Sequence, residues 1–127
     1  MPKRVLVVDD DVEIVKLFEL YLTMHGFTVF TATSGPQAVR IAGAEYLDVL
    51  LCDVRMPDMD GFEVVQAVRE MGCTFPICLH TAYDTFDALT RARELDVQDV
   101  IFKPSPPGVV LTKLTMALTD HTRAGAC

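Results

Sequence analysis

Hydrophobic positions along this 127-residue chain switch between two periods. Short apolar runs such as "RVLVV" are typical of strands buried on both faces. Between these runs, apolar residues recur at three- and four-residue spacing, as on the inner face of a helix. The expected strands are 4–8, 27–33, 47–52, 75–80 and 99–102, and the expected helices are 12–25, 34–45, 62–71, 84–95 and 106–119.

Residues that begin and end helices stand where the pattern changes. Ser34 followed by Pro36 is typical of a helix start, because serine caps free backbone N–H groups and an early proline lacks one. Asp11 has the same capping chemistry before the first expected helix. Gly26 and Gly72 each follow an expected helix, and glycine readily adopts the left-handed conformation that ends a helix.

Five strands that alternate with five helices predict an α/β fold with a doubly wound, five-stranded parallel sheet. Helices then cover both faces of the sheet, and each turns an apolar stripe inward. In the helix at 84–95 we expect Phe86, Leu89, Ala92 and Leu95 to face the sheet.

The helix expected at 12–25 is apolar over much of its circumference, because Leu17, Leu20 and Met24 widen its core stripe. We interpret it as a helix that is generously buried in the core. An exposed apolar face that docks another protein is the alternative.

Charge and composition narrow the class of protein. The net charge of −7 disfavours direct binding to nucleic acid, because phosphate backbones repel an acidic surface. The apolar runs are too short to span a membrane. The length suits one domain, placed at 1–120, with a tail at 121–127. The four cysteines form no CxxC pair, and we interpret them as reduced thiols of a cytoplasmic protein.

Polar residues follow four of the five expected strands. They are Asp9 to Asp11, Asp53, Thr81 and Lys103. Because the carboxyl ends of parallel strands form the ligand-binding edge of such a sheet, we expect these side chains to lie close together. Each has an ordinary interpretation as a cap or a solvated charge, but Asp53 is too far from the next helix to cap it.

This set of side chains suits phosphoryl transfer. Converging carboxylates raise one another's pKa or recruit a cation, and Mg²⁺ prefers oxygen ligands of this kind. Lys103 adds a positive charge for a phosphate and Thr81 a neutral donor. Phosphoryl transfer needs positioned charge and an in-line nucleophile, and the Asp53 carboxylate can be that nucleophile.

The motifs resemble those of the receiver domain of two-component response regulators. They are "DD" after the first strand, "D-x-x-M-P-x-M-D-G" at 53–61, "TA" at 81–82 and "KP" at 103–104, and the resemblance runs over nearly the whole chain. It implies a flavodoxin-like fold. It also implies that Asp53 is the phosphoacceptor for a histidine kinase or phosphotransfer protein.

The resemblance also implies a metal site. Asp10 would bind Mg²⁺ directly and Asp9 through water, with Asp53 and the backbone carbonyl of Arg55 completing the protein ligands. Mn²⁺ is an alternative to Mg²⁺.

Switching in the family links the phosphoryl group to a distant surface. By resemblance, Thr81 and Lys103 would each bind a phosphoryl oxygen, and the Lys103–Pro104 bond would be cis. The family's switch aromatic is replaced here by Val100, which cannot make the same rotation. Phe102 lies on the same side of its strand as Val100. We interpret Phe102 chiefly as a packed core residue. The alternative is that its ring partly takes over the role of the missing switch aromatic.

Three further positions have expectations from the family. Arg55 and Tyr83 occupy positions that tune how fast water removes the phosphoryl group, and a bulky pair predicts a longer-lived phosphate. Asp96 stands where the family has glycine, and aspartate tolerates the left-handed conformation that this turn requires.

The expected partners follow from these assignments. They are the phosphodonor and either a downstream protein or an output domain outside this chain, with the chain itself a monomer or a weak phosphorylation-dependent dimer. It would catalyse only its own phosphorylation and dephosphorylation. A phosphatase of the haloacid dehalogenase type is disfavoured by Arg55, where that class has a second aspartate. An interaction module with little phosphorylation-dependent switching is the alternative function.

Overall fold

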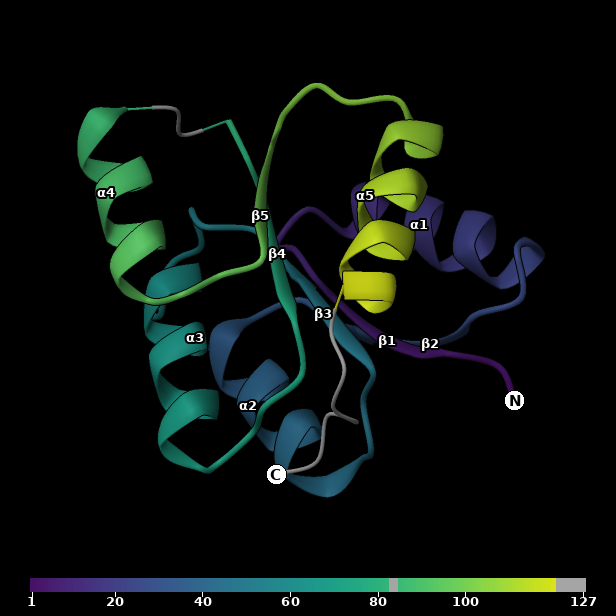
Figure 1. Ribbon diagram of the computed structural model, residues 1–127, viewed down its shortest axis with the longest axis horizontal. Coiled ribbons are helices and arrows are strands. Elements are labelled where there is room, and N and C mark those ends of the chain that lie inside the picture. The colour runs from purple at the N-terminus through teal and green to yellow at the C-terminus, as the bar shows by residue number, and fades with distance from the viewer. Residues whose placement is uncertain (83–84, 121–127) are drawn as a thin grey trace.

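The computed structural model describes residues 1–82 and 85–120, which form one parallel sheet of five strands between two layers of helices (Figure 1). The strand order is β2-β1-β3-β4-β5. In chain order the elements are β1 (Arg4–Val8), α1 (Val12–Met24), β2 (Thr28–Ala32), α2 (Gly35–Ala44), β3 (Val49–Cys52), α3 (Gly61–Glu70), β4 (Ile77–Thr81), α4 (Phe86–Glu94), β5 (Asp99–Phe102) and α5 (Pro107–Asp120). The predicted doubly wound α/β fold is confirmed.

The core has two halves because successive strand residues point to opposite faces of the sheet. Leu6 and Val8 of β1 pack with α2, α3 and α4, whereas Val5 and Val7 pack with α1 and α5. β1 and β3 lie inside the sheet and are buried almost throughout, which explains their unbroken apolar sequences.

The predicted capping residues are confirmed. Asp11 accepts a hydrogen bond from the Glu13 backbone N–H, and Ser34 caps α2. Asp60 and Glu63 form a reciprocal capping box at the start of α3. Each cap satisfies backbone N–H groups that have no partner inside the helix.

The turns that end three helices use the left-handed conformation. Gly26 has φ of 92° and Gly72 has φ of 91°, and each follows the C-cap residue of its helix, α1 or α3. Asp96 has φ of 57°, so aspartate does take the place of glycine after α4. The Lys103–Pro104 peptide bond is cis, as the resemblance implied.

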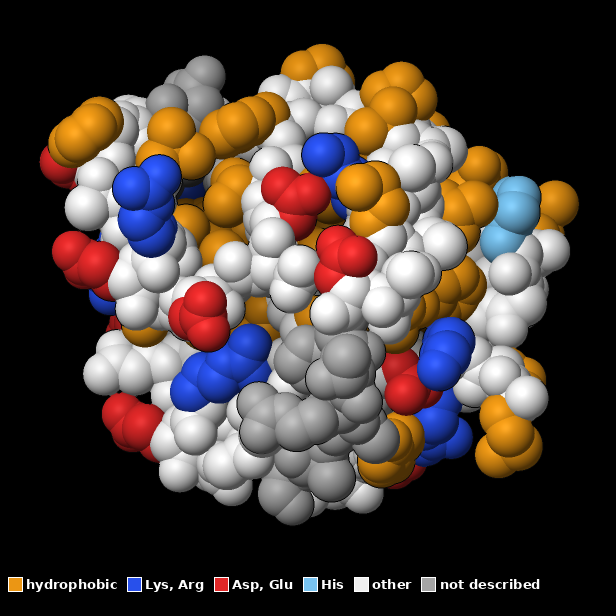
Figure 2. Space-filling model, viewed as in Figure 1, with side chains coloured by type: hydrophobic (Ala, Val, Ile, Leu, Met, Phe, Trp, Pro, Cys, Tyr) orange, Lys and Arg blue, Asp and Glu red, His pale blue; other side chains and the backbone are white. Residues whose placement is uncertain are grey.

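The predicted inner face of α4 is confirmed for Ala92 and Leu95 and is wrong for Phe86 and Leu89. Phe86 and Leu89 are exposed, at 82% and 43%, and the residues that the helix buries are Ala88 and Ala92. The helix rests on these two small side chains. Figure 2 shows hydrophobic side chains gathered along the upper edge of this view, over the start of α4 and the loop that leads into α5.

Two other burial expectations are also wrong. Leu17, Leu20 and Met24 on α1 are 47%, 64% and 72% exposed, so this helix is not generously buried. Phe102 is 40% exposed rather than packed in the core, because its strand β5 lies at the edge of the sheet that the described residues form, next to β4.

Two remaining expectations concern cysteines and membranes. Cys52 and Cys78 are buried free thiols as expected, but Cys73 is disulfide-bonded, so the expectation of reduced thiols is wrong there. Cys127 and the rest of the expected tail, 121–127, lie outside the described residues. Among the described helices, none has the length and apolar character that crossing a bilayer requires.

Candidate functional site

The polar residues at the strand ends meet at one edge of the sheet because the strands are parallel and in register. The backbone N–H of Asp53, after β3, donates to the carbonyl of Val8 in β1 at 2.9 Å. The backbone N–H of Lys103, after β5, donates to the carbonyl of Thr81 in β4 at 2.8 Å. These main-chain bonds fix the starting points of the side chains.

A single ammonium group joins two buried carboxylates at this edge. The Lys103 Nζ lies 2.7 Å from the Oδ2 of Asp9 and 3.5 Å from the Oδ2 of Asp53. Asp9 is 2% exposed and Asp53 is 6% exposed. Lys103 therefore compensates part of the cost of burying carboxylates at the end of hydrophobic strands.

Asp10 completes an acidic cluster that fits a divalent cation. Carboxylate oxygens of Asp9, Asp10 and Asp53 lie within 4.8 Å of one another. Three carboxylates face one ammonium, so two negative charges remain uncompensated when all are ionised. An all-oxygen set with this excess charge suits a hard divalent ion such as Mg²⁺.

Burial and neighbouring charges shift the pKa values of Asp53 and Lys103. Burial, and then the charge of Asp9, raise the pKa of Asp53 to about 6, against the lowering effect of Lys103. Burial acts to lower the pKa of Lys103, but its hydrogen bond to Asp9 and the charge of Asp53 outweigh burial and raise it. The two neighbouring carboxylates therefore stabilise the charged form of Lys103, whereas the single ammonium does not fully offset the cost of burying an ionised Asp53.

Gly61 lets the loop after β3 fold back onto the backbone of Asp53 and Val54. Its N–H donates to the carbonyl of Val54 at 2.8 Å. A Cβ atom at Gly61 would lie 2.3 Å from the backbone oxygen of Asp53, far inside contact distance. The close approach of the two backbones thus requires glycine. This requirement explains why the motif at 53–61 ends in glycine.

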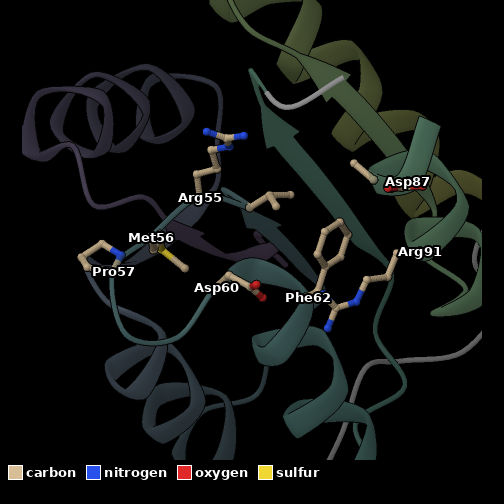
Figure 3. A pocket seen from close by; sticks show the side chains of 9 residues that line it. Arg55, Met56, Pro57, Asp60, Phe62, Asp87 and Arg91 are labelled. Carbon is tan, nitrogen blue, oxygen red and sulfur yellow. The ribbon is translucent and has the colours of Figure 1, made fainter. Parts of the chain in front are cut away.

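Thr81 and Arg55 follow from the ends of β4 and β3, respectively. Thr81 is the last residue of β4 and is 1% exposed. Arg55 is exposed and lines a hollow of about 570 Å³ between the loop after β3 and α4. Figure 3 shows Phe62 between Asp60 and Arg91 in this hollow, where the Arg91 guanidinium lies 4.7 Å from the centre of the Phe62 ring. Tyr83, the other expected tuning residue, lies outside the described residues.

The expected switch residues sit on β5 with different surroundings. Val100 pairs with Leu79 and packs, half-buried, against the core on the α2, α3 and α4 side. Phe102 pairs with Thr81 and is exposed. Phe102 is thus a large side chain on the strand next to Thr81, and its exposure leaves space in which its ring can rotate.

Sequence reasoning missed two polar groups near the site. The thiol of Cys52 donates to the backbone carbonyl of Asp53 at 3.2 Å, and burial raises the pKa of this thiol. His80, to which the sequence analysis assigned no role, lies directly before Thr81 and is 5% exposed. Its position in a strand that must be buried on both faces was a signal that its nitrogens would need partners.

The comparisons with known proteins agree with this geometry. The response regulator receiver domain family model matches residues 5–115. The transcriptional regulatory protein PhoP of Bacillus subtilis is 36% identical over 93% of this chain and 49% of PhoP. The transcriptional regulatory protein PrrA of Mycobacterium tuberculosis is 38% identical over 80% of this chain and 43% of PrrA. The chain thus spans a little less than half the length of each of these relatives.

Solved structures show the same fold. The chemotaxis protein CheY4 of Vibrio cholerae is 30% identical, covers 92% of this chain and 99% of its own, and has a TM-score of 0.88. A CheY-like receiver domain from Methanospirillum hungatei, at 24% identity, has a TM-score of 0.89 over 94% of this chain and 96% of its own. With the family match over 5–115 and the strand-end cluster in place, this chain belongs to the receiver domains of two-component response regulators.

Proposed function

We propose that this chain accepts a phosphoryl group on Asp53 from a histidine kinase or phosphotransfer protein, in a reaction that depends on Mg²⁺ and for which Mn²⁺ can substitute. The observation that supports this most is the buried Asp53 carboxylate that shares one ammonium with Asp9. A carboxylate oxygen of Asp53 attacks the phosphorus, the bond from phosphorus to the donor's imidazole nitrogen breaks, and an acyl phosphate remains.

The metal ligands in this proposal are Asp10, Asp53 and the backbone carbonyl of Arg55, with Asp9 acting through water. Both oxygens of Asp9 already accept hydrogen bonds, one from the Asp11 N–H at 2.9 Å and one from Lys103, which supports an indirect role. Asp10 is exposed and has its carboxylate available. The bound ion would supply positive charge that neutralises the phosphoryl oxygens.

The chain's own side chains hold the remaining phosphoryl oxygens. Lys103 binds one oxygen, for which it must shift from its present contacts with Asp9 and Asp53. The Thr81 hydroxyl binds another. Movement of Thr81 is passed to β5, where Val100 is too small for an aromatic switch and the exposed Phe102 takes part of that role.

The output lies in a downstream protein or in a further domain. PhoP and PrrA are transcriptional regulators about twice as long as the region they share with this chain, and the acidic chain itself is unsuited to bind nucleic acid. We place the protein in the cytoplasm, as a monomer or a weak phosphorylation-dependent dimer with a receiver domain at 1–120. It catalyses only its own phosphorylation and dephosphorylation.

Arg55 and Tyr83 are proposed to shield the acyl phosphate from water. The exposed Arg55 lies two residues after Asp53, where its side chain can reach over the site. We expect the double variant Arg55→Ala, Tyr83→Ala to lose its phosphoryl group several-fold faster than wild type in a timed phosphate-release assay. Equal lifetimes would show that the pair has no such role.

The deciding experiment is intact mass after incubation with acetyl phosphate, with and without Mg²⁺. We expect one phosphoryl adduct on the wild type in the presence of Mg²⁺ and none on Asp53→Asn. The absence of an adduct on folded wild-type protein would contradict the proposed function and would favour an interaction module.

A further inference from the structure

Arg91 of α4 reaches across the hollow described above to the first turn of α3. Its guanidinium lies over the ring of Phe62, 4.7 Å from the ring centre (Figure 3). A cation over the face of an aromatic ring is attracted to it electrostatically. Phe62 is 3% exposed and therefore fixed in the core, whereas Arg91 is exposed. We call this pair the Phe62–Arg91 contact.

The buried face of α4 is made of small side chains. The helix buries Ala88 and Ala92, and its large side chains Phe86 and Leu89 are exposed. Alanine removes little apolar surface from water, so packing against the core stabilises this helix only weakly. The loss of one side-chain contact should therefore be measurable as local opening of α4.

Phe62 is tied in turn to the backbone of Asp53. It follows Gly61, whose N–H donates to the Val54 carbonyl at 2.8 Å. A Cβ atom at Gly61 would lie 2.3 Å from the backbone oxygen of Asp53, so no space separates the two stretches of backbone. Because close-packed interiors transmit displacements, a shift of the backbone at Asp53 must also move the first turn of α3.

We propose that phosphorylation of Asp53 loosens α4 by displacing the Phe62 ring from the Arg91 guanidinium. This inference rests on the proposed function. The Phe62–Arg91 contact is formed in the unphosphorylated chain, and its release makes α4 the responding element. This connection reaches α4 through α3 and does not pass through β5, where Val100 is too small for an aromatic switch.

The displacement begins in the backbone after β3. In the proposed function the Asp53 side chain and the Arg55 carbonyl are drawn to the same cation, and Val54 lies between them. A shift of the Val54 carbonyl carries Gly61 with it, because the two are hydrogen-bonded and Gly61 has no free space against Asp53. Phe62 follows Gly61 directly, and a ring that slides from beneath a guanidinium loses the attraction.

Hydrogen exchange of α4, measured by mass spectrometry of its peptides, tests this inference. Each protein is compared before and after incubation with acetyl phosphate and Mg²⁺, and intact mass gives the phosphorylated fraction. We expect phosphorylation to speed exchange in α4 of the wild type by about two- to fivefold, the factor that loss of one exposed cation–π contact gives. In Arg91→Leu the exchange should be faster by this factor before phosphorylation and should change no further.

The matched control is Arg93→Leu, which removes another exposed arginine from the same helix. Arg93 lines a different hollow with Phe86 and Leu89, so this variant should respond to phosphorylation as the wild type does. Phe62→Leu tests the other half of the contact, since it keeps an apolar side chain in the core but removes the aromatic face. Combined with Arg91→Leu, it should loosen α4 no more than either change alone. Because Arg91 is exposed, Arg91→Leu decides the test even if Phe62→Leu does not fold.

Three results would overturn the inference. They are unchanged α4 exchange in phosphorylated wild type, a phosphorylation response that persists in Arg91→Leu, and an Arg93→Leu variant that behaves like Arg91→Leu. The last result would show that the charge of the helix surface matters rather than the contact with Phe62. If intact mass shows no phosphoryl adduct on the wild type, the proposed function itself is wrong and the inference falls with it.

Discussion

At the scale of single residues, the site depends on charges that the fold holds close together. Asp53 is buried beside Asp9, and Lys103 is shared between them. Burying an acid so that its pKa rises costs stability whenever that acid is ionised. The chain therefore carries, at Asp53, a local instability that a bound cation can relieve.

The pH dependence of stability should reveal this cost. The folded chain holds a proton on Asp53 up to about pH 6, whereas the unfolded chain releases it near 3.8. Since the folded state binds the proton more tightly, stability falls as pH rises between these two values and the loss is complete above them. In metal-free buffer we expect Asp53→Asn to raise the free energy of unfolding by on the order of 2 kcal/mol at about pH 8, and by little at about pH 4.

Urea denaturation at the two pH values measures this effect. Asp58→Asn, at an exposed position with φ of 70° that asparagine also adopts, is the control and should change little. An Asp53→Asn variant that is no more stable than wild type at the higher pH would contradict the expectation.

The close approach at Gly61 gives a second prediction for a single residue. In Gly61→Ala the new Cβ meets the backbone oxygen of Asp53, so either the loop or the end of β3 must shift. We expect a loss of stability of roughly 1–3 kcal/mol and slower phosphorylation by acetyl phosphate. Gly43→Ala is the matched control, because its Cβ would meet only the end of Met71 at ordinary contact distance and alanine favours the helix. Equal stability of the two variants would show that the loop tolerates a side chain.

At the scale of elements, α4 differs from α3 in the side chains that it buries. It buries Ala88 and Ala92, whereas α3, of similar length, buries Phe62 and three valines. Small buried side chains release little apolar surface from water, so this helix gains less from packing. Its exposed Phe86 and Leu89 add nothing to the core.

Hydrogen exchange should separate these two helices. We expect the amides of α4 to exchange about tenfold or more faster than those of α3, because local opening follows the apolar contacts that a segment makes. Mass spectrometry of peptides from each helix in the unphosphorylated chain measures this difference. Equal protection of the two helices would mean that α4 is held by contacts other than its buried alanines.

At the scale of the whole molecule, the chain has a net charge of −7, and its acidic cluster lies at the edge of the sheet formed by the carboxyl ends of the strands. A cation that binds only the folded cluster stabilises the whole chain by mass action. Binding at the cluster is therefore measurable as global stability, without any phosphoryl donor.

We expect millimolar Mg²⁺ to raise the Tm of the wild type by a few degrees relative to buffer with a chelator. Asp10→Asn should abolish this shift because it removes a ligand charge from the cluster. Asp11→Asn should retain it, since Asp11 caps α1 and asparagine caps equally well. A shift that survives in Asp10→Asn would indicate that Mg²⁺ acts elsewhere on the acidic surface.

The strands, the helices, the caps and the fold could be predicted from the sequence, because hydrophobic period and capping chemistry are local properties of the chain. The sequence also placed Asp53, Thr81 and Lys103 together, since parallel strands necessarily bring their carboxyl ends to one edge. Only the tertiary structure decided which side chains are covered. Phe86 and Phe102 are exposed, and the Nε2 of His80 has no hydrogen-bond partner among the described residues, because burial and pairing depend on what neighbouring elements supply. No local pattern contains that information.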